Sequence, residues 1–153
     1  MTDPILDYYQ RIKDGRETVG RWIRLWYEYV IKGLEDKLFF YDARKGEKAI
    51  RFIEKFCRHH EGRLAPGRIV LEPWQKAKIA VIFGIVDENG YRQFREVVCE
   101  EAKKQGKTLE AAAIAAYMTF ADGEYGARIY FTATKLEQAS FCYNAVWQMI
   151  DKE

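Results

Sequence analysis

The feature that most constrains this sequence is a change in its hydrophobic period about halfway along its 153 residues. Beyond the turn dipeptide Asn89-Gly90, residues 91–99 are rich in Tyr, Phe and Val, and residues 127–134 are β-branched and aromatic, so both predict strands. The Ala-rich stretch 106–122 and the closing stretch 135–153 predict helices. Strands that alternate with helices argue for an α/β fold with a parallel sheet.

Helical periodicity dominates the first half of the chain. Apolar residues recur at helical spacing in residues 18–38, 42–60 and 71–85, which predicts three helices. Asp42 is placed to cap the second helix, and Pro73 suits the first turn of the third, because the missing N–H of proline costs nothing there.

Length and composition fit one globular α/β domain over residues 1–153, mainly helical over 1–86 and βαβα over 87–153. Hydrophobic residues make up 48% and charged residues 31%, which excludes a disordered chain. The net charge of +2 is too small to argue for nucleic acid by itself. No apolar run approaches the roughly 20 residues that a membrane span needs, and the N-terminus lacks the apolar region of a secretory signal.

Three cysteines, Cys57, Cys99 and Cys142, are far apart and odd in number. They form neither a disulfide framework nor a zinc pattern, so we expect a reducing, cytoplasmic location. Cys57 lies close to His59 and His60, which would suit a metal. The chain holds no other His to complete such a site, and this favours an ordinary helix end.

A possible phosphate-binding loop, Gly106-Lys107-Thr108, falls between a predicted strand and a predicted helix. In a P-loop (Walker A motif), backbone N–H groups wrap the phosphates, the lysine reaches the outer phosphates, and the hydroxyl holds magnesium. The full motif has glycine where this sequence has Glu101. The tripeptide alone therefore leaves two interpretations open: a phosphate loop, or one long surface helix interrupted at Gly106.

The surrounding sequence favours the first interpretation. The stretches LEPWQKAKI, KKQGKTLEAAAIAAYM and GARIYFTATKLEQA, in this order and spacing, resemble the N-terminal part of the terminase large subunit of tailed bacteriophages, and the resemblance runs from Tyr8 to Met149. That family packages viral DNA with a P-loop ATPase joined to a nuclease. The resemblance implies ATP and Mg2+ as cofactors, double-stranded DNA and other packaging subunits as partners, and the cytoplasm of a bacterial host cell as location.

The resemblance also implies roles for individual residues. Gln75 would bind the adenine edge, whereas without the resemblance a solvated polar residue at a helix start would be the favoured interpretation. Gly106 and Lys107 would bind phosphates and Thr108 the magnesium. Lys103 stands where the family often has an arginine, so Lys103 and Lys107 are the catalytic candidates; a lysine there keeps the charge but loses the planar fork. Two further residues, Lys135 and Gln138, would either couple the site to DNA or simply begin a helix.

Two departures from the family pattern predict an incomplete nucleotide site. Glu100 and Glu101 place two negative charges before the loop, where they would repel a triphosphate. The sequence ends at Glu153 without a later apolar strand that ends in paired acidic residues, so we expect no measurable ATP hydrolysis by the isolated chain. Unpaired sheet edges predict self-association. The alternative is a non-catalytic protein-interaction module, or a phage remnant, with a degenerate nucleotide site.

Overall fold

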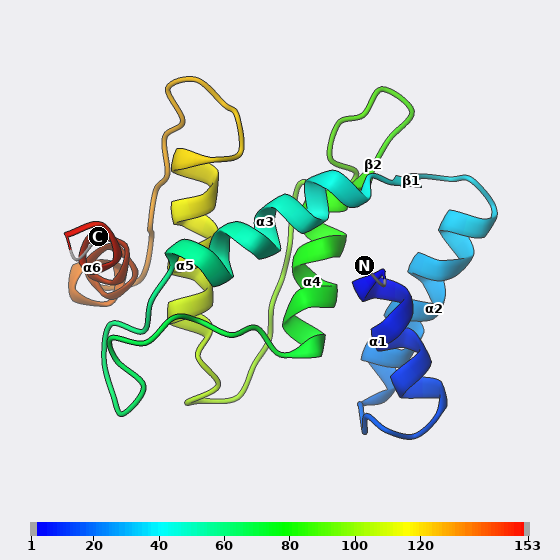
Figure 1. Ribbon diagram of the computed structural model, residues 1–153, viewed down its shortest axis with the longest axis horizontal. Coiled ribbons are helices and arrows are strands. Elements are labelled where there is room, and N and C mark those ends of the chain that lie inside the picture. Colours follow the sequence, from blue (N-terminus) through cyan, green and yellow to red (C-terminus); the bar gives the residue numbers. More distant parts are fainter. Residues whose placement is uncertain (1–2, 152–153) are drawn as a thin grey trace. The chain divides into compact units, whose positions relative to one another are not determined.

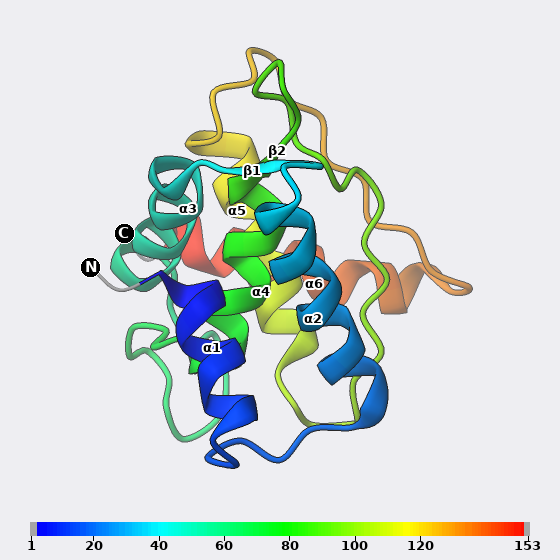
Figure 2. The ribbon, with the colours of Figure 1, turned by 90° about the vertical axis from the view of Figure 1, so that its right-hand side faces the viewer.

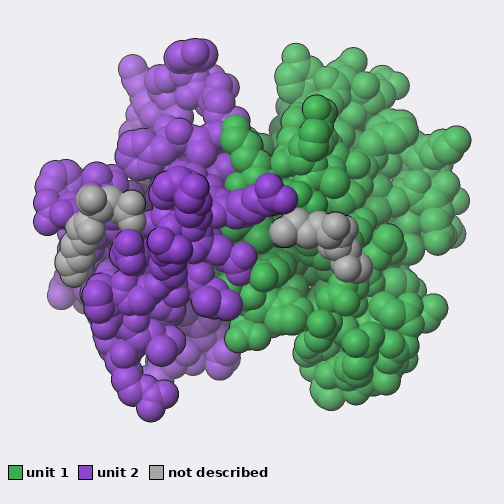
Figure 3. All heavy atoms as spheres, in the orientation of Figure 1, with its two compact units in different colours: residues 1–50, 71–97 green, residues 51–70, 98–153 purple. Residues whose placement is uncertain are grey.

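The computed structural model describes residues 3–151 and contains mainly helices. Its elements in chain order are α1 (Pro4–Lys13), α2 (Arg21–Glu35), β1 (Phe40–Tyr41), α3 (Ala43–Phe56), α4 (Pro73–Gly84), β2 (Ile85–Val86), α5 (Lys107–Phe120) and α6 (Leu136–Asp151). These elements fall into two compact units, which Figure 3 shows in different colours. Unit 1 comprises Met1–Ile50 and Leu71–Val97, and unit 2 comprises Arg51–Val70 and Val98–Glu153.

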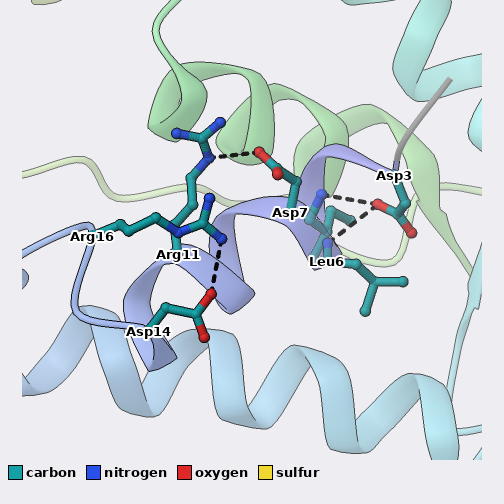
Figure 4. A network of polar contacts seen from close by, with 7 residues as sticks. Asp3, Leu6, Asp7, Arg11, Asp14 and Arg16 are labelled. Carbon is teal, nitrogen blue, oxygen red and sulfur yellow. Dashed lines mark hydrogen bonds and ion pairs between the residues drawn. The ribbon is translucent and has the colours of Figure 1, made fainter.

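Helix α1 begins unit 1 with a well-formed cap. Asp3 precedes Pro4, and its Oδ1 accepts hydrogen bonds from the backbone N–H groups of Ile5 at 2.8 Å and Leu6 at 3.4 Å. Arg11 bonds Asp7 one turn earlier at 2.7 Å, as Figure 4 shows. This helix was not predicted from the sequence, although Asp-Pro at its start is a helix-start signal.

Helix α4 forms the apolar centre of unit 1. It carries buried residues on most sides, as expected of a helix that lies inside a core: Ala77, Ile79, Ala80, Val81, Phe83 and Gly84. Helix α1 packs against α4 and also against α2 (Figure 1, Figure 2). The faces that meet include Ile5, Tyr8 and Ile12 of α1 and Tyr27 and Val30 of α2, all buried.

The sheet of unit 1 is short and antiparallel. Strand β1 pairs with β2 in the register Phe40 to Val86 and Tyr41 to Ile85. The turn predicted at Asn89-Gly90 is confirmed directly after β2, since the Asp87 carboxylate accepts bonds from the N–H groups of Asn89 and Tyr91, both at 2.9 Å. Gly90 has a φ of +78°, a left-handed conformation that suits glycine.

Helix α5 is the apolar centre of unit 2. Its alanines let other elements approach closely, and its buried residues include Ala112, Ala113, Ala115, Ala116 and Tyr117. Helix α6 packs against α5 through its buried Ala145 and Met149. The ring of Phe52, in the part of α3 that belongs to unit 2, meets the Tyr117 ring edge-on at 5.6 Å between centroids.

The prediction of a mixed α/β fold is confirmed, but the predicted strands and their parallel sheet are not seen in residues 3–151. Residues 91–99 and 127–134 are irregular, apart from one isolated bridge between Arg92 and Val86. A strand needs a hydrogen-bonded neighbour, and side chains such as Val98 (96% exposed) lack a packed surface to lie on. Phe94 instead packs its ring against Trp26 and Phe39 of unit 1.

The predicted helices are confirmed with tighter limits. Residues 18–38, 42–60, 71–85 and 106–122 shorten to α2, α3, α4 and α5. The last predicted helix, 135–153, is observed as α6, and its final two residues lie outside the described part of the chain. None of the helices in residues 3–151 is long and apolar enough to cross a membrane.

A close contact in unit 1 leads to a first testable expectation. Gly33 is buried in α2, and a Cβ added there would lie 2.2 Å from Cζ of Phe39, whose side chain is only 1% exposed. Gly33→Ala should therefore lower the free energy of unfolding by about 1–3 kcal/mol, although the same change stabilises most helices. Urea denaturation measures it. Gly20→Ala, where an added Cβ meets no atom within 4 Å, is the matched control; a Gly33→Ala protein as stable as that control would contradict the packing.

The hydroxyl of Tyr41 gives a second expectation. It is buried and has no hydrogen-bond partner among the described residues, and burial raises the pKa of Tyr41 above its ordinary value of 10.0. Tyr41→Phe should therefore raise the free energy of unfolding by about 1 kcal/mol, because an unsatisfied buried hydroxyl is removed.

The pH dependence adds a second readout. A raised folded-state pKa means that stability is fully present below pH 10 and is lost as the pH rises further. Tyr41→Phe should lose less stability than the parent between neutral pH and about pH 11. Thermal unfolding at both pH values checks this. Tyr91→Phe, at a residue that is 66% exposed, is the control and should behave like the parent.

Candidate phosphate-binding site

Helix α5 begins at a left-handed turn of the backbone. Gly106 is the N-cap and takes the left-handed conformation with φ +80° and ψ 10°, while Lys107 begins the helix. Lys104 also has a positive φ, of 67°, so the chain curls tightly just before the helix. A left-handed residue followed by helical residues turns successive N–H groups toward one side, which favours an anion.

The first turn of α5 supplies donors toward the same region. The Glu110 N–H bonds the Gly106 carbonyl at 3.0 Å and is the first of the regular helix bonds. The N–H groups of the three preceding residues have no helical carbonyl to bond. Together with the positive end of the helix dipole they attract negative charge.

A pocket of about 290 Å³ opens at this helix start, entirely within unit 2. Its walls come from two segments far apart in the sequence, residues 59–61 and 104–109. The lining residues are His59, His60, Glu61, Lys104, Gly106, Lys107, Thr108 and Leu109. Two lysines and a threonine at a helix start therefore line one cavity, with Glu61 as the acidic residue among them. The lysines and the helix start favour an anion.

The side chain of Lys107 lies back along its own loop. Its Nζ donates a hydrogen bond to the backbone carbonyl of Glu101 at 3.3 Å. This is a long bond, and a phosphate oxygen would offer the ammonium a shorter, charge-assisted one.

The two acidic residues before the loop differ in their surroundings. Glu100 is exposed, whereas Glu101 is half-buried. Neither of them lines the pocket. A charge in open solvent is strongly screened, so any repulsion of a phosphate at this site would come mainly from Glu101.

The structure brings together only part of the predicted site. Gly106, Lys107 and Thr108 line the pocket, whereas Lys103 is exposed and Lys104 takes the place at the wall. Gln75 belongs to unit 1, where its Oε1 accepts a hydrogen bond from the Glu72 N–H at 3.0 Å and closes the first turn of α4.

Sequence reasoning missed the second wall of the pocket. In the sequence, His59 and His60 suit either a metal site or a helix end, and Glu61 begins a loop. No periodic signal links these residues to the loop around Lys107. Within residues 3–151, no three His, Cys, Asp or Glu side chains are grouped as metal ligands. Cys57 is buried as part of the core.

The segment before α6 makes ordinary helix-start contacts. The Thr134 hydroxyl bonds Oε1 of Gln138 at 3.1 Å, and the Gln138 N–H bonds the Lys135 carbonyl at 3.0 Å. Lys135 and Gln138 can be interpreted from the sequence either as coupling the site to DNA or as a helix start. These contacts are those of a helix start.

Comparisons with known proteins identify the family of this chain. A family model described as "Terminase large subunit, ATPase domain" matches residues 73–153, which include the whole loop. The terminase large subunit of Enterobacteria phage HK97 is 30% identical over 108 residues, which cover 70% of this chain and 20% of that relative. The chain thus spans about a fifth of that relative's length. No solved structure gives a significant match. Both matches show that the chain belongs to the terminase large subunit family and contains sequence of its ATPase domain.

Proposed function

We propose that this chain carries the ATP-binding part of a viral DNA-packaging motor. The observation that carries the proposal is the left-handed turn at Gly106, which opens α5 and leaves Lys107 and Thr108 on the wall of the pocket. In the intact motor, ATP hydrolysis would drive double-stranded DNA into a capsid, together with other packaging subunits, in the cytoplasm of the host bacterium.

Each predicted site residue would contact a different part of the nucleotide. The Lys107 ammonium would exchange its 3.3 Å bond to the Glu101 carbonyl for the outer phosphates of ATP. The exposed Lys103 would stabilise the charge that develops during phosphoryl transfer, as a point charge without the fork of an arginine. Gln75 would meet the adenine through its amide, whose oxygen already accepts the Glu72 N–H.

The magnesium ion would arrive with the nucleotide. Thr108 can supply one hydroxyl oxygen, and the described residues group no set of three side-chain ligands for a resident metal. This fits Mg2+, which keeps several waters and binds through a few protein oxygens and the phosphates. When bound, it would neutralise charge on the phosphates.

The proposed function also implies a parallel sheet around the loop. Residues 91–99 and 127–134 have the composition of strands, and they expose side chains such as Val98 and Tyr130, which are 96% and 77% exposed. We infer that they become neighbours in a parallel sheet when further strands pair with them. Unpaired edges of such a sheet would also favour self-association.

A second candidate function rests on the surface of α6. Phe141, Tyr143 and Trp147 are each more than half exposed, and large exposed aromatic side chains are common where proteins bind one another. A module that binds a protein and only weakly a nucleotide would use this surface. Nucleotide binding by the loop separates the two functions.

The central test is nucleotide affinity. Isothermal titration of Mg-ATP into the chain should show binding, and Lys107→Ala should weaken it at least tenfold, because a charge-assisted contact to phosphate is lost. Lys135→Ala, which removes an exposed lysine outside the pocket, is the matched control and should bind like the parent. Equal losses of affinity in the two variants would show that the overall positive charge, and not a specific contact of Lys107, attracts the nucleotide. The absence of binding by the parent would refute the proposal.

Removing the negative charge of Glu101 should affect nucleotide affinity more than removing that of Glu100. Glu101→Gln should tighten Mg-ATP binding by about three- to tenfold, from roughly 1 kcal/mol of repulsion removed. Glu100→Gln should change it less than twofold, because that side chain is exposed. The gain from Glu101→Gln should shrink at 0.5 M salt. Titrations at two salt concentrations measure this, and an equal gain from both variants would show that the half-buried position of Glu101 has no influence.

A further inference from the structure

The second wall of the pocket is held rigidly from behind. The Ile69 N–H bonds the Cys57 carbonyl at 3.1 Å, and the His59 N–H bonds the Gly67 carbonyl at 2.9 Å. Both bonds join antiparallel segments that flank the isolated bridge between Arg58 and Arg68. Cys57 is 1% exposed and Ile69 is 6% exposed, so the base of this loop is anchored in the core of unit 2. The chain therefore presents the next residue, His60, to the pocket from a fixed support.

The imidazole of His60 is enclosed but lacks hydrogen bonds within the described part of the chain. Its side chain is 13% exposed, and its Nδ1 is buried with no hydrogen-bond partner. Its Nε2 lies 3.8 Å from Oε1 of Glu61, which is too far for a hydrogen bond. A buried polar group without a partner costs free energy that an apolar side chain of similar shape would not. An unsatisfied group of this kind in a native structure calls for an explanation.

A ligand of the loop would provide the missing partner. His60 lines the same cavity as Lys104, Lys107 and Thr108. A phosphate chain that these residues hold would bring several acceptor oxygens into the cavity. The χ2 torsion of histidine has a broad, roughly two-fold profile, so a turn of the ring about this bond can exchange its edges and aim an N–H at the cavity.

We propose that His60 is a contact residue of the nucleotide site, whose ring N–H donates a hydrogen bond to the phosphate chain bound at the start of α5. The inference rests on the proposed function of the loop and extends it to a second segment of the chain. The charged residues that line the cavity with His60 are Glu61, whose side chain is 84% exposed, Lys104 and Lys107. A neutral imidazole suffices for this contact, because one of its two nitrogens always carries a proton.

The test compares two probes on substituted chains. His60→Ala should weaken both Mg-ATP and inorganic tripolyphosphate about tenfold, as expected for a lost hydrogen bond to a charged acceptor. His60→Gln keeps a side-chain N–H and should retain affinity within about threefold of the parent. Arg63→Ala, an exposed change in the same loop, is the matched control and should bind both probes like the parent. Isothermal titration at one pH and one salt concentration measures all four proteins.

Thermal unfolding without ligand separates binding from folding. His60→Ala should melt at the temperature of the parent or higher, because it removes an unsatisfied buried atom. Unchanged affinity in His60→Ala, alongside a large loss in Lys107→Ala, would overturn the inference and leave the loop assignment standing. A loss for Mg-ATP alone would place the contact on the nucleoside and overturn the phosphate assignment. If the parent binds neither probe, the loop assignment fails and this inference fails with it.

Discussion

The close packing of α5 is the interaction on which the candidate site depends. Four alanines and Tyr117 bury one side of this helix, and α6 and the Phe52 ring pack against it. Side chains this small leave little freedom for the helix to slide or rotate, because any shift opens gaps that the neighbours cannot fill. The first turn of α5, whose residues Lys107, Thr108 and Leu109 line the cavity, is therefore held in position. The chemistry of the loop is local, but its placement comes from the core of unit 2.

The helices could be predicted from sequence because their signals are local. Apolar spacing marked α2 to α6, and Asp87 to Gly90 carried enough turn chemistry to place that turn correctly. The strands could not be predicted in the same way. Aromatic residues such as those of segment 91–99 are common in β-strands, but a strand also needs a hydrogen-bonded neighbouring strand. Phe94 instead packs against the rings of Trp26 and Phe39. Short α1 escaped notice because its apolar stripe is brief, although Asp3 marked its start.

Half of the candidate site was visible in the sequence and half was not. The tripeptide at Gly106 and the helix after it are contiguous, so their chemistry can be read directly. The wall at His59 and His60 joins the cavity through backbone bonds from Cys57 and His59 to the segment near Ile69, which no periodicity reveals. The family resemblance identified the loop but implied no role for His59 or His60. Contacts between segments that are distant in the sequence cannot be predicted from single motifs.

The division into two units has a consequence for the order in which the protein is made. The chain passes between the units three times, after Ile50, Val70 and Val97, so each unit is assembled from separate stretches. During synthesis, residues 51–70, which include the two histidines, leave the ribosome before unit 1 is complete, and their partners around α5 follow only after Val97. Because domains generally fold as their residues become available, unit 1 can close while residues 51–70 still wait for the rest of unit 2. The cavity at the start of α5 therefore forms only after residues 104–109 have joined residues 59–61, which is later than the core of unit 1 can close.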